Sequence, residues 1–376
     1  MSWDLIGHEW AADFLKEHIS RDQLRHAYLI TGPQGIGRRT LALRFAQALN
    51  CTQPPAPGVP CQQCLSCRQI GRMQHPDLAV VQSEKSAYLH AQKLNPGGSD
   101  YQPGQSNSKR KRSQRSDQPF ELSNQILIDQ IRDLQRTLAL TPYQSTYRIA
   151  LILQVEDARE HAANSLLKTL EEPSSSSILV LTAESAERLP ATLVSRCELI
   201  RLRPVPIERL EQALQAAYQL PDDQARLVAH LSGGRPGIAI ELSQDKDLQD
   251  KRISWLDDHA RLLSASRVER FSYAGSIADL SQRERSSPRE ILRDQLKEQL
   301  TVWMSLWRDV YLQASGASVP LTNVDRLGEI GKISSRFGPR AALDTIRSIE
   351  RVLGLLERNV NPRLATEVLM LDLPRW

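Results

Sequence analysis

Four of the five cysteines lie within 17 residues of one another, as Cys51, Cys61, Cys64 and Cys67. Two C-x2-C steps that share Cys64 have the spacing with which thiolates coordinate Zn²⁺ tetrahedrally. Because four thiolates close the coordination shell and leave no open position for catalysis, we predict a structural zinc site. The segment has no core of its own, so the metal would supply its folding energy. An iron–sulfur cluster and reduced thiols are the alternatives, and Cys197 stands apart as a predicted core residue.

Three glycines have the spacing of a phosphate-binding loop. Gly32, Gly35 and Gly37 follow a short apolar run at residues 26–30 and precede a helical pattern at residues 41–49. Glycines placed between a strand and a helix let backbone N–H groups surround an anion at the N-terminus of the helix. The pattern therefore indicates a nucleotide-type loop, with an unrelated glycine turn as the alternative.

The residues that complete this loop are of the wrong type for hydrolysis. Arg38 and Arg39 stand where a working loop has the lysine that reaches the phosphates and the hydroxyl residue that holds Mg²⁺. Arg38 keeps a positive charge without the compact ammonium, and Arg39 offers no atom that ligates a metal. We therefore predict that Gly32, Gly35, Gly37 and Arg38 form a vestigial phosphate loop, and we regard ATP binding there as doubtful.

A nucleotide-hydrolysing site also needs acids at the end of a buried strand. The apolar run at residues 149–153 predicts a central parallel strand, and this run ends in Leu153 and Gln154. Neither side chain is an acid, so a second, independent part of the metal site is missing. Glu156 and Asp157 follow closely, and a register shift of two or three residues would restore the acids of an ATPase.

Strand and helix patterns alternate through the first 200 residues and must position these groups. The predicted strands cover residues 26–30, 78–81, 149–153 and 178–181, and the predicted helices cover residues 41–49, 126–140 and 162–170. This order predicts an α/β domain of three layers around a parallel sheet. No strand pattern is evident from about residue 205 onward, where we expect helices only.

The length of 376 residues suggests two or three domains. We predict an α/β domain over residues 1–204, a helical lid over 205–243 and a larger helical domain over 244–376. Inside the first domain we place the zinc module, residues 51–67, and a disordered basic insertion, residues 83–120. The insertion is rich in Ser, Gln, Asn and Gly, so it has too little apolar surface to offset the entropy of ordering.

Charge and hydropathy narrow the class of protein. The net charge of +4 is too mild to predict nucleic-acid binding. Residues 83–120 hold seven basic and three acidic side chains, which we interpret as a solvated charge run, with contact to DNA phosphates as the alternative.

No apolar run reaches the roughly 20 residues that cross a bilayer, and the first ten residues lack a signal-peptide segment. We expect a cytoplasmic protein without a membrane partner.

Three features together resemble the clamp-loader subunits of bacteria, which belong to the AAA+ class. They are the glycine loop, the four-cysteine insertion after its helix, and the string AANSLLKTLEEP at residues 162–173. The string VSRC at residues 194–197 adds to the similarity. The resemblance covers residues 1–82 and 121–240 well and weakens in the C-terminal helices.

Within this family the sequence is most similar to the delta-prime subunits of DNA polymerase III. Gamma/tau subunits are similar over the same stretch, but they should carry an intact Lys-Thr loop and an acidic pair after the buried strand. Arg38, Arg39, Leu153 and Gln154 separate the two groups. The resemblance implies an AAA+ domain, a helical lid and a C-terminal helical collar, with gamma/tau and delta as partners.

The resemblance also implies roles for single residues. Arg196 would act in trans as an arginine finger, reaching the γ-phosphate of ATP on a neighbouring subunit. An arginine that tethers the start of a helix is the alternative, and Arg235 would occupy a sensor position. The implied function is a non-hydrolysing assembly protein that helps load the sliding clamp on primer–template DNA. An active gamma/tau-like ATPase and a zinc-stabilised DNA-binding module are the competing hypotheses.

Overall fold

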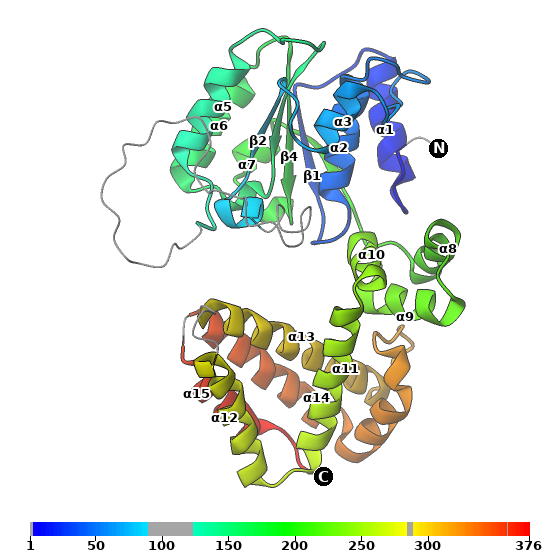
Figure 1. Ribbon diagram of the computed structural model, residues 1–376, viewed down its shortest axis with the longest axis vertical. Coiled ribbons are helices and arrows are strands. Elements are labelled where there is room, and N and C mark those ends of the chain that lie inside the picture. Colours follow the sequence, from blue (N-terminus) through cyan, green and yellow to red (C-terminus); the bar gives the residue numbers. More distant parts are fainter. Residues whose placement is uncertain (1–2, 89–122, 284–288, 359) are drawn as a thin grey trace. The chain divides into compact units, whose positions relative to one another are not determined.

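The chain forms two compact units, residues 1–205 and 206–376, in its computed structural model. The structure describes residues 3–88, 123–283, 289–358 and 360–376 (Figure 1). Most of the predicted basic insertion, residues 83–120, lies outside the described residues, although residues 84–88 form a helical segment.

The first unit is built on a five-stranded parallel sheet with the order β2-β3-β4-β1-β5. The strands are β1 (Ala27–Thr31), β2 (Leu78–Val81), β3 (Arg148–Ile152), β4 (Ser177–Ala183) and β5 (Glu198–Arg201). Every residue of β1, β3 and β4 is buried, as expected for central strands covered on both faces. The predicted α/β fold with a parallel sheet is confirmed.

Helices cover both faces of this sheet. They are α1 (Glu9–Ser20), α2 (Arg38–Leu49), α3 (Leu65–Gly71), α5 (Ile128–Leu138), α6 (Glu160–Glu171) and α7 (Ala191–Val194). Figure 1 shows α1 and α2 on one side of the sheet and α5 and α6 on the other. Successive side chains of β1 point to opposite faces of the sheet. Tyr28 therefore packs in the hydrophobic cluster with α1 and α2, and Leu29 packs in the hydrophobic cluster with α5 and α6.

Helix α1 and strand β5 are among the elements of the first unit that the sequence pattern does not predict, as are the short helices α3 and α7. Helix α1 buries Ala11, Ala12 and Leu15, and alanines contribute little to an apolar periodicity. Strand β5 pairs only with β1, at the edge of the sheet, and of its four residues only Ile200 is buried. Short edge strands of this kind lack the continuous apolar run that identifies a central strand.

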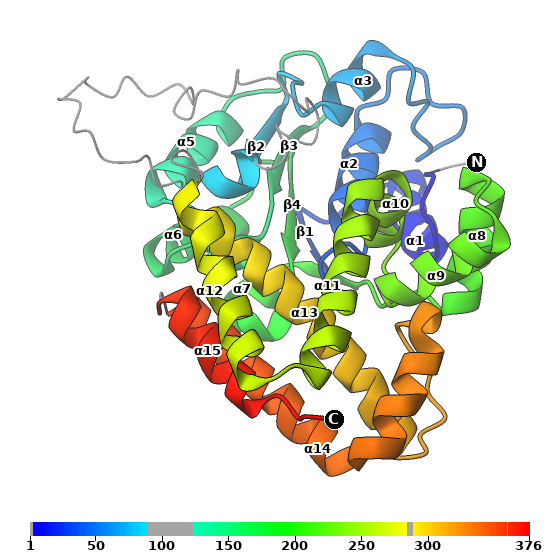
Figure 2. The same cartoon turned by 60° about the horizontal axis from the view of Figure 1, so that its bottom comes forward.

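The second unit is helical throughout its described residues, as predicted. Its helices are α8 (Ile207–Tyr218), α9 (Asp222–Ser232), α10 (Pro236–Gln244), α11 (Lys246–Ser264), α12 (Arg267–Arg283), α13 (Arg289–Ala314), α14 (Leu327–Glu357) and α15 (Pro362–Asp372). The predicted lid corresponds to α8–α10 and the predicted collar to α11–α15. Helix α13 packs against α14, and α12 packs against α15 (Figure 2). None of the described helices is long and apolar enough to cross a membrane.

A buried cation attaches the C-terminal helix to the second unit. Arg270 on α12 is 5% exposed and donates to backbone carbonyls at the ends of two other helices. These acceptors belong to Leu262, Leu263, Met370, Leu373 and Pro374. The last carbonyls of a helix have no partner within the helix and carry a partial negative charge. One guanidinium therefore provides hydrogen-bond donors for the backbone carbonyls at the C-terminal ends of both α11 and α15.

Candidate functional site

The loop between β1 and α2 turns through three glycines with positive φ. The φ angles of Gly32, Gly35 and Gly37 are 149°, 78° and 107°. A Cβ atom on Gly32 would lie 2.6 Å from the carbonyl oxygen of Leu202, so this position requires glycine. Gly37 precedes α2, and no side chain caps the first turn of that helix. The loop thus leads three glycines to the uncapped N-terminus of α2, and its role as a phosphate site stays a prediction.

The guanidinium of Arg38 faces an acid of its own site. Its Nη1 lies 3.9 Å from Oε1 of Glu156, and the two side chains are only 10% and 15% exposed. Burial lowers the pKa of Arg38, which nearby Glu156 and Glu184 partly restore. Oε1 of Glu156 in turn accepts the backbone N–H of Glu184 at 2.8 Å. The positive charge that would meet a phosphate is therefore already opposed within the chain.

Arg39 contacts a sulfur atom. Its Nη2 lies 3.1 Å from Sδ of Met73, which follows α3. Burial lowers the pKa of Arg39 to about 10. A side chain that offers only N–H donors stands where a working loop presents a metal-binding oxygen.

Strand β3 ends without an acid, as the sequence predicts. Leu153 is buried, and the backbone N–H of Gln154 donates to Oγ1 of Thr182 at 3.0 Å. Glu156 and Asp157 belong to the short 3-10 turn η1 (Val155–Asp157), which follows the strand. The structure therefore brings Glu156, rather than the two residues at the strand end, to the phosphate loop.

Arg196 lies between the ends of two helices of the first unit. Its Nη2 is 2.7 Å from Oε1 of Glu171, the last residue of α6, and its Nη1 donates to the carbonyl of Thr192 at 2.7 Å. The Arg196 side chain remains 35% exposed. These contacts use two of the five N–H donors that a guanidinium offers.

Arg235 belongs to the second unit and precedes α10. Its Nε donates to the carbonyl oxygen of Ser232 at 2.7 Å, and burial lowers its pKa. Through this contact Arg235 closes the turn between α9 and α10, and a sensor role for it stays a prediction.

The four predicted metal ligands come together. The sulfur atoms of Cys51, Cys61, Cys64 and Cys67 all lie within 4.8 Å of one another, and those of Cys61 and Cys67 are 4.0 Å apart. Zn–S bonds of about 2.3 Å in a tetrahedron place sulfurs about 3.8 Å apart, so the cluster has the right size for this ion.

Backbone N–H groups support the cysteine sulfurs. The N–H of Cys61 donates to Cys51 at 3.3 Å, that of Cys64 to Cys61 at 3.3 Å, and that of Cys67 to Cys64 at 3.4 Å. Donors aimed at sulfur stabilise thiolates and orient metal ligands. Cys197 is separate from this cluster and packs against the apolar cluster of α5 and α6. Burial raises its pKa to about 12.

Sequence reasoning missed how firmly the cysteine segment joins the α/β core. Nε1 of Trp3 donates to the carbonyl of Gly58 at 3.1 Å, and Nε2 of Gln47 donates to the carbonyl of Cys67 at 2.7 Å. The buried polar residue Gln47, on an otherwise apolar face of α2, is the only local signal of this contact. The segment is thus anchored to the first unit at Gly58 and Cys67, although residues 52–57 are exposed.

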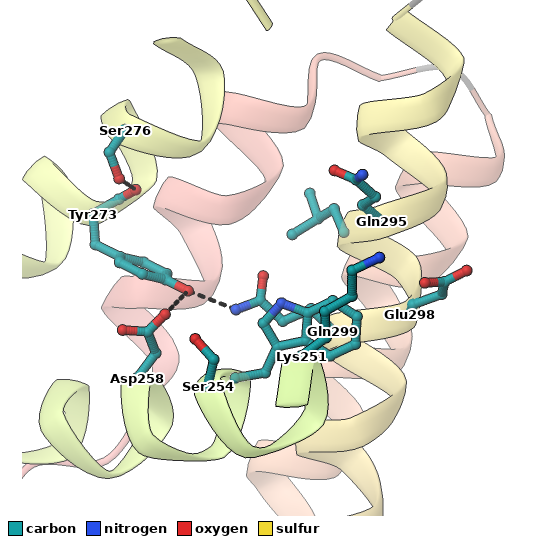
Figure 3. A pocket seen from close by; sticks show the side chains of 10 residues that line it. Lys251, Ser254, Asp258, Tyr273, Ser276, Gln295, Glu298 and Gln299 are labelled. Atoms are coloured by element: carbon teal, nitrogen blue, oxygen red, sulfur yellow. Dashed lines mark hydrogen bonds between the residues drawn. The ribbon is translucent and has the colours of Figure 1, made fainter. Parts of the chain in front are cut away.

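The second unit contains a polar cavity of about 340 Å³ among α11, α12 and α13. Figure 3 shows the Tyr273 hydroxyl pointing toward Asp258 and Gln299. The hydroxyl donates to Oδ2 of Asp258 at 3.2 Å and accepts from Nε2 of Gln299. Burial raises the pKa of Tyr273, so it remains a neutral donor. We assign these contacts to the packing of the three helices.

Comparison with known proteins gives concordant matches. A family model described as "DNA polymerase III, delta subunit" matches residues 7–206. DNA polymerase III subunit delta' of Pseudomonas aeruginosa is 29% identical over 258 residues, which are 68% of this chain and 66% of that protein. Subunit delta' of Bacillus subtilis is 29% identical over 63% of this chain and 60% of that protein. Subunit tau of B. subtilis is 26% identical over 68% of this chain and 38% of that protein. The matches span less than two thirds of each relative.

Asp157 generates a pH-dependent prediction. Burial, together with Glu156 and Glu184, raises its pKa from 3.8 to about 6. The folded chain therefore holds this proton up to about pH 6 while the unfolded chain releases it near pH 4, so stability falls as pH rises through that window. Asp157→Asn should raise the free energy of unfolding relative to wild type by about 1–2 kcal/mol more at pH 7.5 than at pH 4.5. Urea denaturation at the two pH values measures the free energy of unfolding, and Asp13→Asn, at an exposed position, is the control. An equal effect of Asp157→Asn at both pH values would contradict the prediction.

Proposed function

We propose that this chain, which belongs to the DNA polymerase III delta-subunit family, works as a delta-prime-like subunit of a bacterial clamp loader. In this role it would assemble with gamma/tau and delta subunits in the cytoplasm. Through that complex it would help place the sliding clamp on primer–template DNA during replication. It would be an accessory subunit of the polymerase holoenzyme and not an ATPase by itself.

One observation carries the non-hydrolysing part of this proposal. The position that should ligate Mg²⁺ is occupied by Arg39, whose guanidinium contacts Sδ of Met73. Phosphoryl transfer depends on a metal ion that bridges the phosphates and neutralises developing charge. A cation with no metal-binding atom supports an inactive site, and the opposed charges of Arg38 and Glu156 support it further.

The position of Glu156 supports a second candidate function. It lies beside the phosphate loop, where an active gamma/tau-like ATPase would need an acid. In that alternative, Arg38 would replace the usual lysine, and Glu156 or Asp157 would hold the metal's water shell or position the attacking water.

We expect the purified chain to show no Mg²⁺-dependent ATP hydrolysis above background, because the metal ligands of both halves of the site are missing. A coupled phosphate-release assay makes the measurement. Turnover that is present in wild type and lost on Glu156→Gln or Asp157→Asn would establish the ATPase alternative. Turnover that persists in both variants identifies a contaminating enzyme.

We further propose that the four cysteines hold a structural Zn²⁺. The sulfur separations match the ion, and the short connector between Cys51 and Cys61 has little core of its own. Bound zinc would close the segment into a knuckle by linking its two ends. The chain's own N–H donors would orient Cys51, Cys61 and Cys64 for this purpose.

Metal analysis of the full chain should find one Zn²⁺ per molecule. Cys64→Ser should lose most of this metal, because three thiolates bind the ion more weakly than four. Cys197→Ser is the matched control and should retain it, since Cys197 is outside the cluster. A native protein that contains no metal, and in which the thiols of Cys51, Cys61, Cys64 and Cys67 are freely titratable, would exclude the zinc site.

Arg196 is proposed to act on a nucleotide held by a neighbouring subunit. Its guanidinium is partly exposed and keeps free donor capacity beyond Glu171 and Thr192. A planar fork of donors suits the charge spread over transferring phosphoryl oxygens. The ion pair with Glu171 would hold the side chain in position until the neighbour docks.

Arg196→Ala should leave zinc content and assembly intact but lower ATP hydrolysis at the one adjoining site by about 10³–10⁵-fold. Arg196→Lys should restore little, because an ammonium cannot reproduce the fork. Clamp loading by the reconstituted complex is the readout, since other sites contribute to total turnover.

Glu171→Gln is the control for this experiment, because it removes the ion pair and keeps Arg196. It should load clamps nearly normally, because Arg196 keeps its hydrogen bond to the carbonyl of Thr192. If both substitutions destabilise the isolated chain equally while Arg196→Ala leaves loading intact, Arg196 is a structural tether of α6 and α7.

A further inference from the structure

An exposed loop at the amino-terminal end of β3 carries two large apolar side chains. Residues 139–147 connect α5 to β3, and within them Leu140 is 61% exposed and Tyr143 is 76% exposed. Side chains in this position contribute little core packing to fix the loop. Its conformation must therefore come from polar contacts of its backbone.

A buried carboxylate holds the backbone of this loop. Asp77 is fully buried and accepts the N–H groups of Tyr143, Gln144 and Ser145 at 2.6, 2.8 and 3.0 Å. Burial alone would raise the pKa of Asp77, but these three donors lower it below its usual value. Arg148 completes the group, with Nη2 3.4 Å from Asp77. The loop is thus pinned to the residues just before β2.

The same loop is joined to the cysteine segment at its other side. Asn50, which immediately precedes Cys51, exchanges two hydrogen bonds with the backbone of Tyr147, at 2.8 and 3.1 Å. Ser66 lies between Cys64 and Cys67 and donates to the carbonyl of Asn50 at 2.8 Å. Both ends of the cysteine segment therefore meet at the start of β3.

His75 bridges the two groups, and its contacts define its tautomer. The backbone N–H of Asp77 donates to Nδ1 of His75 at 3.0 Å, so Nδ1 is an acceptor and the proton lies on Nε2. Nε2 is 3.2 Å from Oγ of Ser66 and 3.4 Å from Oγ of Ser145. One N–H is thus shared between α3, which contains Cys67 and begins after Cys64, and the exposed loop.

We propose that the metal-loaded cysteine cluster fixes the exposed loop 139–147 through Asn50, Ser66 and His75. The inference rests on the proposed zinc site. It extends that proposal, because bound metal would then order residues outside the cysteine segment. Without the metal, the segment between Cys51 and Cys67 loses the cross-link that holds Asn50 and Ser66 in place. The loop should then loosen before the sheet does, since β3 and β4 are buried on both faces.

Hydrogen exchange of the full chain, followed by mass spectrometry, tests this inference. Chelation should speed exchange of the amides of residues 143–147 by about tenfold or more, while those of β4 keep their protection. Ser66→Ala retains all four cysteines and should speed the same amides by about fivefold to tenfold at full zinc content. Ser20→Ala, an exposed serine on α1, is the matched control and should change nothing there.

The outcomes separate this inference from the zinc proposal. A chain that contains zinc, but whose amides at 143–147 respond neither to chelation nor to Ser66→Ala, overturns the coupling and leaves the zinc site standing. A chain that is purified without metal overturns both. Equal loss of protection in β4 and in the loop also overturns the coupling, because it shows general unfolding of the unit.

Discussion

Parallel pairing is the constraint on which the first unit depends. Because β1, β3 and β4 run in the same direction, the segments that follow their carboxyl ends meet at one edge of the sheet. The glycine loop follows β1, the turn with Glu156 follows β3, and Glu184 follows β4. One geometric rule thus brings the glycine loop, Glu156 and Glu184 to the same edge. The opposite edge receives the amino-terminal ends, with Asp77 and the loop before β3.

The fold was largely predictable because its central strands are continuous apolar runs between turn residues. Residues 149–153 are an example: burial on both faces leaves no place for a polar residue, so the run is visible in the sequence. The cysteine spacing was equally informative, because ligand geometry restricts sequence spacing. Helix α1 and strand β5 escaped prediction, since small residues and a half-exposed edge give weak periodic signals.

The site was less predictable, because its decisive contacts join distant segments. The residue types at positions 39 and 153, on which the prediction of an inactive site rests, are visible in the sequence alone. The approach of Glu156 to Arg38 depends on how a 3-10 turn leaves β3, and nothing in the local pattern specifies that turn. The hydrogen bonds between Asn50 and Tyr147 span 97 positions. Asn50 directly follows α2 and Tyr147 precedes β3, so these partners become neighbours only when α2 packs on the sheet.

The carbonyl contacts of Arg270 have a consequence for how the second unit responds to ionic strength. Surface ion pairs such as that of Arg351 and Asp372 weaken as dissolved salt screens their charges. The guanidinium of Arg270 is bound by neutral backbone oxygens inside the protein, where mobile ions do not reach. The attachment of α15 is therefore a salt-tolerant joint within the second unit.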